Sequence, residues 1–288
     1  MTVAVVTGAN QGLGLALVRG LCRELGDEAV VYLAARDKAR GEAAVAGLRD
    51  EGLTPRLRVL DVRDTDAVDS FADAVRDEHG GVDIVLSNAA ARRTPERPES
   101  EQIRTFVDTN NFGTRRMIDA FGPILDDGAR FVVVASAFGS LHWLPESMHN
   151  RFETASMTLD DVDSVMTDFV DRVEAGTAVD AGWPTDANIV SKVGQVAAMR
   201  VMAREYAGEA RRRGILINAA CPGMVYTEAS RPWFDAATLA RAKSPDDAAV
   251  DVRWLATMPA GTDSPYGELV QYRDVLPWEA ADWRAKFG

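Results

Sequence analysis

The sequence predicts an α/β fold built on one doubly wound parallel β-sheet flanked by helices. Three observations predict it. A short Val-rich run, Val3–Thr7, leads into glycines and then into a helical pattern. Strand-like and helical runs alternate along the chain at the spacing of βαβ units. Polar residues follow the ends of the strand-like runs, where parallel sheets bind ligands. With 288 residues, 47% of them hydrophobic, the chain can form one large domain over residues 1–288.

The glycines after the first strand have the spacing G-x-x-x-G-x-G, and a helical pattern follows from Leu15 to Leu25. Glycines allow a sharp bend and a close approach of the backbone to a ligand. The following helix presents free N–H groups and a positive dipole end. This order predicts a dinucleotide pyrophosphate site in a Rossmann-type fold, with a turn that binds no ligand as the alternative. The expected contacts are Gly8, Asn10, Gln11, Gly12, Leu13 and Gly14.

The second strand, Ala29–Ala35, ends at Arg36. In nucleotide-binding folds this end meets the adenosine ribose, where an acid binds the 2′-hydroxyl and a base accommodates a 2′-phosphate. Arg36, with Lys38 and Arg40 nearby, therefore favours NADP(H). Asp37 keeps NAD(H) open, and a solvated surface charge is the alternative role for Arg36.

The elements that follow continue the alternation. We expect helices at 41–51, 65–79, 103–121, 158–175, 188–208 and 245–258, and strands at 56–60, 82–86, 130–135, 215–220 and 267–272. Residues 92–101 are expected to form a polar loop. Because ligands lie at the carboxyl ends of the strands, Gly8, Arg36, Asp61 and Asn88 are expected at one edge of the sheet.

Several motifs resemble those of the short-chain dehydrogenase/reductase family. They are T-G-A-N-Q-G-L-G at Thr7–Gly14, D-V at Asp61–Val62 and S-N-A-A at Ser87–Ala90. The segments T-N-N-F-G-T at 109–114, G-W-P at 182–184 and N-A-A-C-P-G at 218–223 are similar to the monomeric carbonyl reductase branch. The resemblance continues to about Trp278.

The resemblance implies an oxidoreductase that binds NADP(H). It assigns cofactor contacts, beyond those of the glycine loop, to Arg36, Asp61, Val62, Asn88, Ala89, Ala90, Lys192, Pro222, Gly223, Val225 and Thr227. It also implies that Ser136 hydrogen-bonds the substrate oxygen and that Asn110 kinks its helix and holds a water of the proton relay. Gln11 is a departure, because the branch usually has Lys there near the 2′-phosphate. Ala90 is another, since Gly is usual at that position.

The family's catalytic Tyr-x-x-x-Lys motif is incomplete, because Lys192 is in register but Asn188 occupies the Tyr position. Ketone reduction builds negative charge on oxygen, and a phenol can supply the proton. An amide can only donate a hydrogen bond. A substitute donor could be Tyr226, His142, Asp186 or an acidic group on the substrate. Asp186 could instead cap the helix, and the other two side chains could only line the site.

Two hypotheses follow from the retained Ser136, Lys192, Asn110 and glycine loop. In the first, the protein transfers hydride to an activated carbonyl, quinone or conjugated enone, whose oxyanion needs only hydrogen bonds from Ser136 and Asn188. In the second, the redox role is lost. The protein would then catalyse a cyclisation, dehydration or isomerisation, or only bind nucleotide.

Two segments are longer than their counterparts in related proteins. An insertion over about 138–182 contains the amphipathic helix 158–175, which in the similar reductases covers a tetramer-forming surface, so we expect a monomer, with a dimer contact as the alternative. Residues of about 228–244 are expected to form a lid over a flat, apolar, polycyclic or quinone-like substrate. Aromatic side chains tucked into the core are the alternative. The candidate substrate residues are His142, Trp143, Tyr226, Trp233 and Phe234.

The charge excludes some classes of partner. Acidic residues outnumber basic ones by 44 to 32, for a net charge of −12, so nucleic-acid and anionic-membrane partners are not expected. The two cysteines, Cys22 and Cys221, lack metal-ligand spacing, so no metal site is expected. A reducing cytoplasm and a small-molecule substrate are the simplest expectations.

Overall fold

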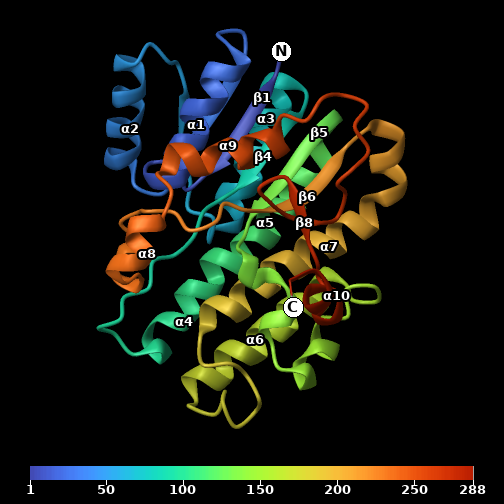
Figure 1. Cartoon of the computed structure of the whole chain (residues 1–288). Helices are drawn as coiled ribbons and strands as arrows, with labels where there is room; N and C mark the ends of the chain where they lie inside the picture. Colours follow the sequence, from blue (N-terminus) through green and yellow to red (C-terminus); the bar gives the residue numbers. More distant parts are fainter. Residues whose placement is uncertain (288) are drawn as a thin grey trace.

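The computed structural model describes residues 1–287 and contains one eight-stranded sheet at its centre (Figure 1). Its strand order is β3-β2-β1-β4-β5-β6-β7-β8, and every neighbouring pair is parallel except β7 and β8. The chain reverses its direction of winding between β1 and β4, so the predicted doubly wound α/β sheet is confirmed. The strands are β1 Val3–Thr7, β2 Val30–Ala35, β3 Arg56–Val59, β4 Val82–Ser87, β5 Leu125–Val134, β6 Leu216–Cys221, β7 Leu269–Gln271 and β8 Asp274–Leu276.

Helices cover both faces of the sheet (Figure 1). Apolar side chains of α1, α2 and α9 form one buried cluster with one face, and those of α3, α4, α5, α6 and α7 form a second with the other. The central strands β1, β2 and β6 are buried along their whole length, as their continuous apolar sequence predicts. The helices are α1 Gly12–Leu25, α2 Lys38–Asp50, α3 Thr65–His79, α4 Glu99–Val107, α5 Gly113–Phe121, α6 Leu159–Glu174, α7 Ala187–Arg213, α8 Ala236–Arg241, α9 Pro245–Ala256 and α10 Ala280–Phe287.

The single helix expected over 103–121 is interrupted. Residues Asp108–Phe112 form a π turn between α4 and α5, and Asn110 lies within it. The helix also begins earlier than expected, at Glu99, where acidic side chains in the first turn suit the helix dipole. A π turn of this kind is frequent at functional sites. This π turn interrupts the helix at Asn110, where the family resemblance implies a kink.

The C-terminal region also differs from expectation. The strand expected over 267–272 is a hairpin of β7 and β8, joined by Tyr272 and Arg273, which both have positive φ (51° and 70°). Turns of this type usually contain Asn or Gly, and because neither residue is at these positions, no local signal predicted a hairpin. In the tail beyond it, α10 packs on residues 141–143, where the rings of Trp283 and His142 stack 5.3 Å apart.

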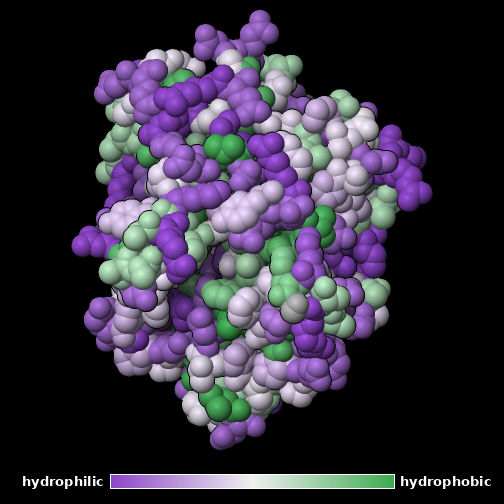
Figure 2. Space-filling view, viewed as in Figure 1, coloured by the Kyte–Doolittle hydropathy of each residue, from purple (hydrophilic) through white to green (hydrophobic). Residues whose placement is uncertain are grey.

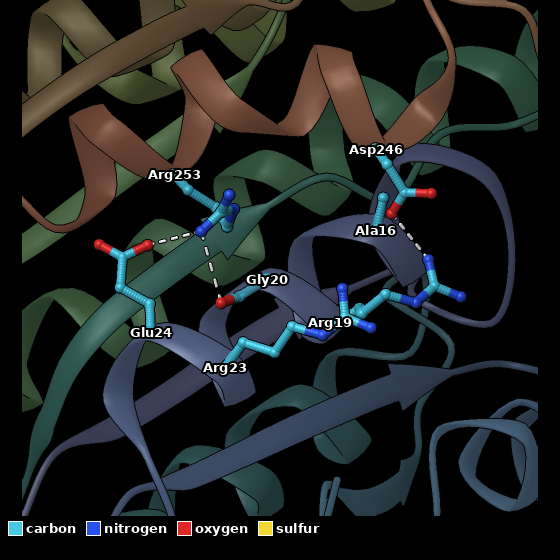
Figure 3. A pocket seen from close by; sticks show the side chains of 7 residues that line it. All are labelled: Ala16, Arg19, Gly20, Arg23, Glu24, Asp246 and Arg253. Atoms are coloured by element: carbon cyan, nitrogen blue, oxygen red, sulfur yellow. Dashed lines mark hydrogen bonds and ion pairs between the residues drawn. The ribbon is translucent and has the colours of Figure 1, made fainter. Parts of the chain in front are cut away.

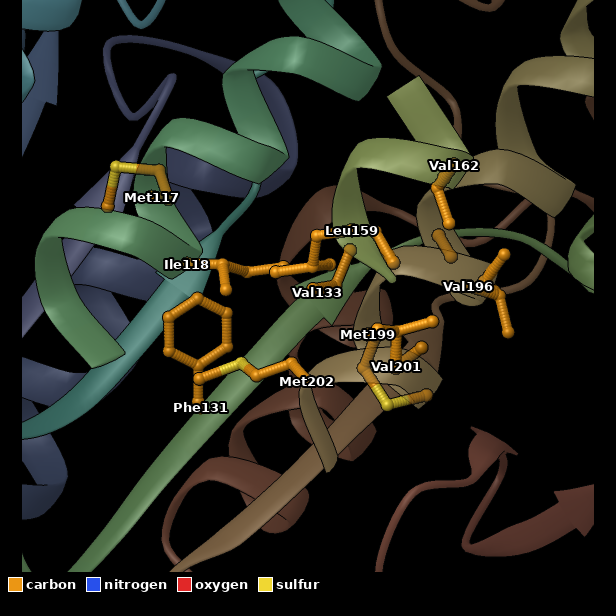
Figure 4. Close-up of a cluster of buried hydrophobic side chains, with 14 of the residues drawn as sticks. Met117, Ile118, Phe131, Val133, Leu159, Val162, Val196, Met199, Val201 and Met202 are labelled. Atoms are coloured by element: carbon orange, nitrogen blue, oxygen red, sulfur yellow. The ribbon is translucent and has the colours of Figure 1, made fainter. Parts of the chain in front are cut away.

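The insertion packs against the rest of the chain. Helix α6 begins with a capping box between Thr158 and Asp161 and contacts α4 and α7. Figure 4 shows its side chains Leu159 and Val162 beside those of α5, β5 and α7 in the larger buried cluster. The apolar face of α6 is therefore covered within the chain.

The face seen in Figure 2 mixes hydrophilic and hydrophobic residues without one broad apolar patch, and its surface is hollowed beside α8. Among residues 1–287, no helix combines the length and the apolar character that crossing a membrane requires.

Candidate active site

The glycine loop is built for a close approach between strand ends. Gly8 and Gly12 have positive φ values of 65° and 55°. A Cβ on Gly8 would lie 2.7 Å from the Ala89 Cα, and one on Gly12 would lie 3.3 Å from the Thr227 methyl group. Helix α1 begins here without a side-chain cap and without an acidic residue in its first turn, so its N-terminus suits an anion.

Hydrogen bonds fix the end of β4 against this loop. The Asn88 side-chain amide donates to the Thr7 carbonyl at 2.8 Å. The Thr7 hydroxyl oxygen accepts from the backbone N–H groups of Asn88 and Ala89 at 2.9 and 3.0 Å. The structure therefore brings Gly8, Gly12, Asn88, Ala89 and Thr227 together, as the predicted cofactor set requires. Their contacts with a cofactor stay predictions.

Replacing Gly14 by Ala should destabilise this loop. The added Cβ would lie 2.5 Å from the Gly8 carbonyl oxygen and 2.7 Å from the Asn88 side-chain nitrogen. Both atoms belong to the packed loop, so we expect a loss of about 1–3 kcal/mol in the free energy of unfolding. Gly47→Ala is the matched control, because nothing lies within 4 Å in mid-helix α2 and stability should rise by up to about 1 kcal/mol. Urea unfolding measures both, and equal effects would contradict the close packing.

The ends of β2 and β3 lie side by side, since the Leu60 N–H donates to the Ala35 carbonyl at 2.9 Å. Arg36 is exposed there. Asp61 accepts from the Arg63 guanidinium at 2.7 Å, and this bond holds the pKa of the Asp61 carboxyl below its usual range. Asp37 caps α2 by accepting from the Arg40 N–H at 2.9 Å, so its carboxylate already has a structural role. Our sequence reasoning missed Arg63, whose only signal was its place directly after Asp61–Val62.

The N-terminus of α7 places Asn188 in its first turn. Asp186 is the N-cap and accepts from the Asn188 N–H at 2.9 Å, so the expectation that it caps the helix is confirmed. The same carboxylate oxygen, Oδ1, accepts from Arg93 at 3.0 Å. This carboxylate oxygen is therefore already engaged by the helix cap and by Arg93. Tyr226, another candidate donor, is largely exposed and has its backbone paired with Lys243.

Lys192 is held at the end of β5. Its ammonium donates to the Gln195 side-chain oxygen at 2.7 Å and to the Val134 carbonyl at 3.4 Å, two residues before Ser136. Burial lowers the pKa of Lys192 to about 8. The Ser136 oxygen accepts from the Phe138 N–H at 3.3 Å. Lys192 of α7 therefore lies beside the end of β5, close to the segment that contains Ser136.

A buried line of hydrogen bonds runs inward from Lys192. The Gln195 side-chain NH₂ donates to the Thr114 hydroxyl at 3.1 Å, and that hydroxyl donates to the Asn110 carbonyl at 2.6 Å. Gln195, Thr114 and Asn110 are each at most 2% exposed. Because an amide cannot release a proton at neutral pH, this line orients Lys192 rather than carrying protons. We did not identify Gln195 as a site residue from the sequence, because nothing in the pattern distinguishes it from the other residues of a long helix.

The Asn110 side chain ties the loop after β4 to α7. Its oxygen accepts from the Ala91 N–H at 2.8 Å and its nitrogen donates to the Ser191 hydroxyl at 3.2 Å. The Ser191 hydroxyl donates in turn to Asn111 at 2.9 Å. The π turn therefore joins three parts of the site through side chains that are almost fully buried.

The candidate substrate residues fall into two groups. His142 and Trp143 belong to an aromatic cluster with Phe138 and Trp283. Trp233 and Phe234 lie in the segment before α8, where Trp233 is 48% exposed. The alternative in which Trp233 is tucked into the core is therefore wrong. Cys221 is buried and accepts from the Gln271 side chain at 3.2 Å, and burial raises the pKa of its thiol.

The free energy of unfolding should depend on pH in a way that reveals the burial of Lys192. The folded protein gives up this proton near pH 8, whereas an ordinary Lys keeps it to about 10.5. Between these values the unfolded state binds more protons, so the contribution of Lys192 to the free energy of unfolding rises with pH. Relative to Lys192→Met, the wild type should gain roughly 2–3 kcal/mol between pH 7.5 and 10.5. Urea unfolding of both proteins measures it, and parallel pH curves would contradict the burial.

A cavity of about 460 Å³ lies elsewhere, between α1 and α9 (Figure 3). Its charges neutralise one another, because Arg253 pairs with Glu24 at 2.6 Å and Arg19 with Asp246 at 2.8 Å. Gly20 in its wall is eight residues beyond the start of α1, about 12 Å along the helix axis. We therefore place the candidate site at the strand ends. No group of three His, Cys, Asp or Glu side chains in residues 1–287 could hold a metal ion.

Comparison with known proteins agrees with this architecture. A family model described as short chain dehydrogenase matches residues 2–148. Carbonyl reductase [NADPH] 1 of Rattus norvegicus is 35% identical over 96% of this chain and 98% of its own. Among solved structures, menthone neomenthol reductase from Mentha piperita is similar with a TM-score of 0.75 and 25% identity over 95% of this chain and 99% of its own. Salutaridine reductase from Papaver somniferum has a TM-score of 0.80 at 24% identity, over 93% of this chain and 99% of its own. The chain belongs to the short-chain dehydrogenase family.

Proposed function

We propose that this protein is an NADP(H)-dependent oxidoreductase that reduces an apolar, polycyclic aromatic or quinone-like carbonyl compound. One observation carries the proposal. The buried Lys192 is retained beside the segment of Ser136, whereas Asn188, an amide, takes the place of the phenol. The similarity over nearly the whole chain to a carbonyl reductase named for NADPH supports the cofactor and the reaction class.

The cofactor would lie across the strand ends. The uncapped start of α1 and the glycine loop would hold the pyrophosphate, and Arg36 the 2′-phosphate, while Lys192 and Thr227 would meet the nicotinamide half. When bound, NADPH supplies a hydride to the carbonyl carbon. The chain's own part is to orient the substrate and to stabilise the charge that develops on its oxygen, through hydrogen bonds from Ser136 and Asn188.

The missing phenol narrows the substrate class. A quinone or an enone spreads its developing charge over a conjugated system and yields a weakly basic oxygen, which can take its proton from water. A simple aliphatic ketone yields a strongly basic alkoxide and needs an acid. We therefore propose activated carbonyls as substrates, with Trp233 and Phe234 of the lid as apolar contacts.

A redox-neutral reaction on a bound substrate is the second candidate, favoured by the absence of a phenol or a free carboxylic acid at the start of α7. We also propose a monomer in one domain, because the apolar face of α6 is covered by α4 and α7.

The test follows the absorbance of NADPH with a panel of quinones, polycyclic ketones and simple ketones. Consumption with quinones and little with simple ketones would support the proposal. Nucleotide binding by calorimetry without consumption of any member would favour the redox-neutral reaction. No binding of either NADPH or NADH would overturn both.

A further inference from the structure

Arg93 lies at a junction between the candidate lid and the start of α7. Its side chain is only 10% exposed. The guanidinium donates to Glu99 of α4 at 2.6 Å and to Asp186 at 3.0 Å. A charge buried to this degree needs such partners, and both of them fix its orientation.

The same guanidinium is stacked between two aromatic rings. It lies 4.7 Å from the ring centroid of Phe106, which is buried in α4, and 5.1 Å from that of Trp233 in the lid. Arginine suits such a site because its planar group can stack while its edge donates hydrogen bonds. Arg93 therefore anchors the exposed Trp233 ring to the protein core.

The segment that carries Trp233 is fastened at both ends. Near its start, the Thr227 N–H donates to the Ser230 hydroxyl at 3.0 Å and the Ser230 N–H donates to the Thr227 hydroxyl at 3.1 Å. Near its end, the backbone of Lys243 exchanges bonds of 2.9 Å with Met224 and Tyr226. Trp233 lies between these two ties and contacts Arg93.

Asp186 transmits the position of Arg93 to Asn188. A single carboxylate oxygen, Oδ1, accepts from both the Arg93 guanidinium and the Asn188 N–H. A shift of Arg93 therefore changes the cap that orients the first turn of α7. The line Trp233–Arg93–Asp186–Asn188 joins the lid to the residue in the place of the missing phenol.

We propose that Arg93 is a positioning residue that couples closure of the lid over a substrate to the orientation of Asn188. The proposal rests on the proposed function, because it assigns Asn188 to the substrate oxygen. A substrate that enters beneath the lid displaces or tightens the Trp233 stack, and Arg93 passes that movement to the helix cap. Activity then depends on Trp233 beyond its contact with the substrate.

The test compares Arg93→Lys, which keeps the charge but loses the planar stack and the two-pronged donor, with Trp233→Leu and the double variant. Arg92→Lys, an exposed neighbour in the same loop, is the control. With menadione and NADPH, each single variant should raise KM and lower kcat by about three- to tenfold. The double variant should be no worse than Trp233→Leu alone, because that variant already removes the coupling that Arg93→Lys removes. Multiplicative losses would overturn the proposal.

Two readouts need no turnover. The lid contains the exposed Arg241, which is followed by Ala242, so trypsin should cut there faster in Arg93→Lys and Trp233→Leu than in Arg92→Lys. The ¹⁵N–¹H resonance of Asn188 should shift in Trp233→Leu, although Trp233 is linked to it only through Arg93 and Asp186. If no substrate is consumed, the proposed function fails while these readouts still decide the coupling. An unmoved Asn188 resonance with unchanged cleavage would overturn the coupling itself.

Discussion

Replacing Asn188 by Tyr is expected to raise the rate of simple ketone reduction by about 10²- to 10⁴-fold, the usual contribution of a positioned general acid. The substitution places a phenol one helical turn before Lys192. The Lys192 ammonium and its partner Gln195 are already in place, and a nearby positive charge lowers the pKa of a phenol toward the working range. The measurement is kcat/KM for a small aliphatic or aryl ketone with NADPH.

Asn188→Phe is the matched control, because it adds the same ring without the hydroxyl. Reduction of a quinone should change much less than that of a ketone in Asn188→Tyr, since the quinone oxygen needs no acid. A Tyr variant that is no faster than the Phe variant on any ketone would show that Lys192 and Ser136 no longer form a working reductase site. Thermal unfolding of both variants checks that each is folded.

Replacing Arg36 by Asp is expected to reverse the cofactor preference. Charge-assisted hydrogen bonds to a phosphate contribute roughly 1.5–3 kcal/mol, so NADPH should bind about 10- to 100-fold more weakly, and charge repulsion adds to the loss. A carboxylate at this strand end can accept hydrogen bonds from the ribose hydroxyls of NADH, whose binding should strengthen. Calorimetric titration with both nucleotides gives the ratio of their Kd values.

The new carboxylate would lie near Asp61, whose pKa is held down mainly by Arg63 and also by the charge of Arg36. The pKa of Asp61 should therefore rise in Arg36→Asp, and the loss of NADPH affinity should be smaller at low pH. Arg97→Asp makes the same change of charge in the exposed loop before α4 and should leave both Kd values unchanged. An equal loss in the two variants would mean that net charge, not a phosphate contact at Arg36, sets the affinity.

Local sequence patterns were enough to predict the architecture and the backbone segments that surround the candidate site. Continuous apolar runs predicted the buried parallel strands, and their alternation with helices predicted the winding of the sheet. The glycines between β1 and α1 predicted a turn where side chains would clash, and Gly8 and Gly14 do lie within 3 Å of neighbouring atoms at their Cβ positions. The cap at Asp186 was also readable, because an N-cap depends on residues within one turn.

What the sequence determined by itself was therefore whatever depends on neighbours along the chain: the strands, the helices and the glycine turn. That Asn188 stands at the family's Tyr position stays a prediction. Only the tertiary structure decided which distant side chains meet. The π turn at Asp108–Phe112, the partnership of Lys192 with Gln195 and Thr114, and the stack of Arg93 between Phe106 and Trp233 have no periodic signal. Each is selected because a buried polar or charged group must find a partner, and that partner is fixed by how the elements pack.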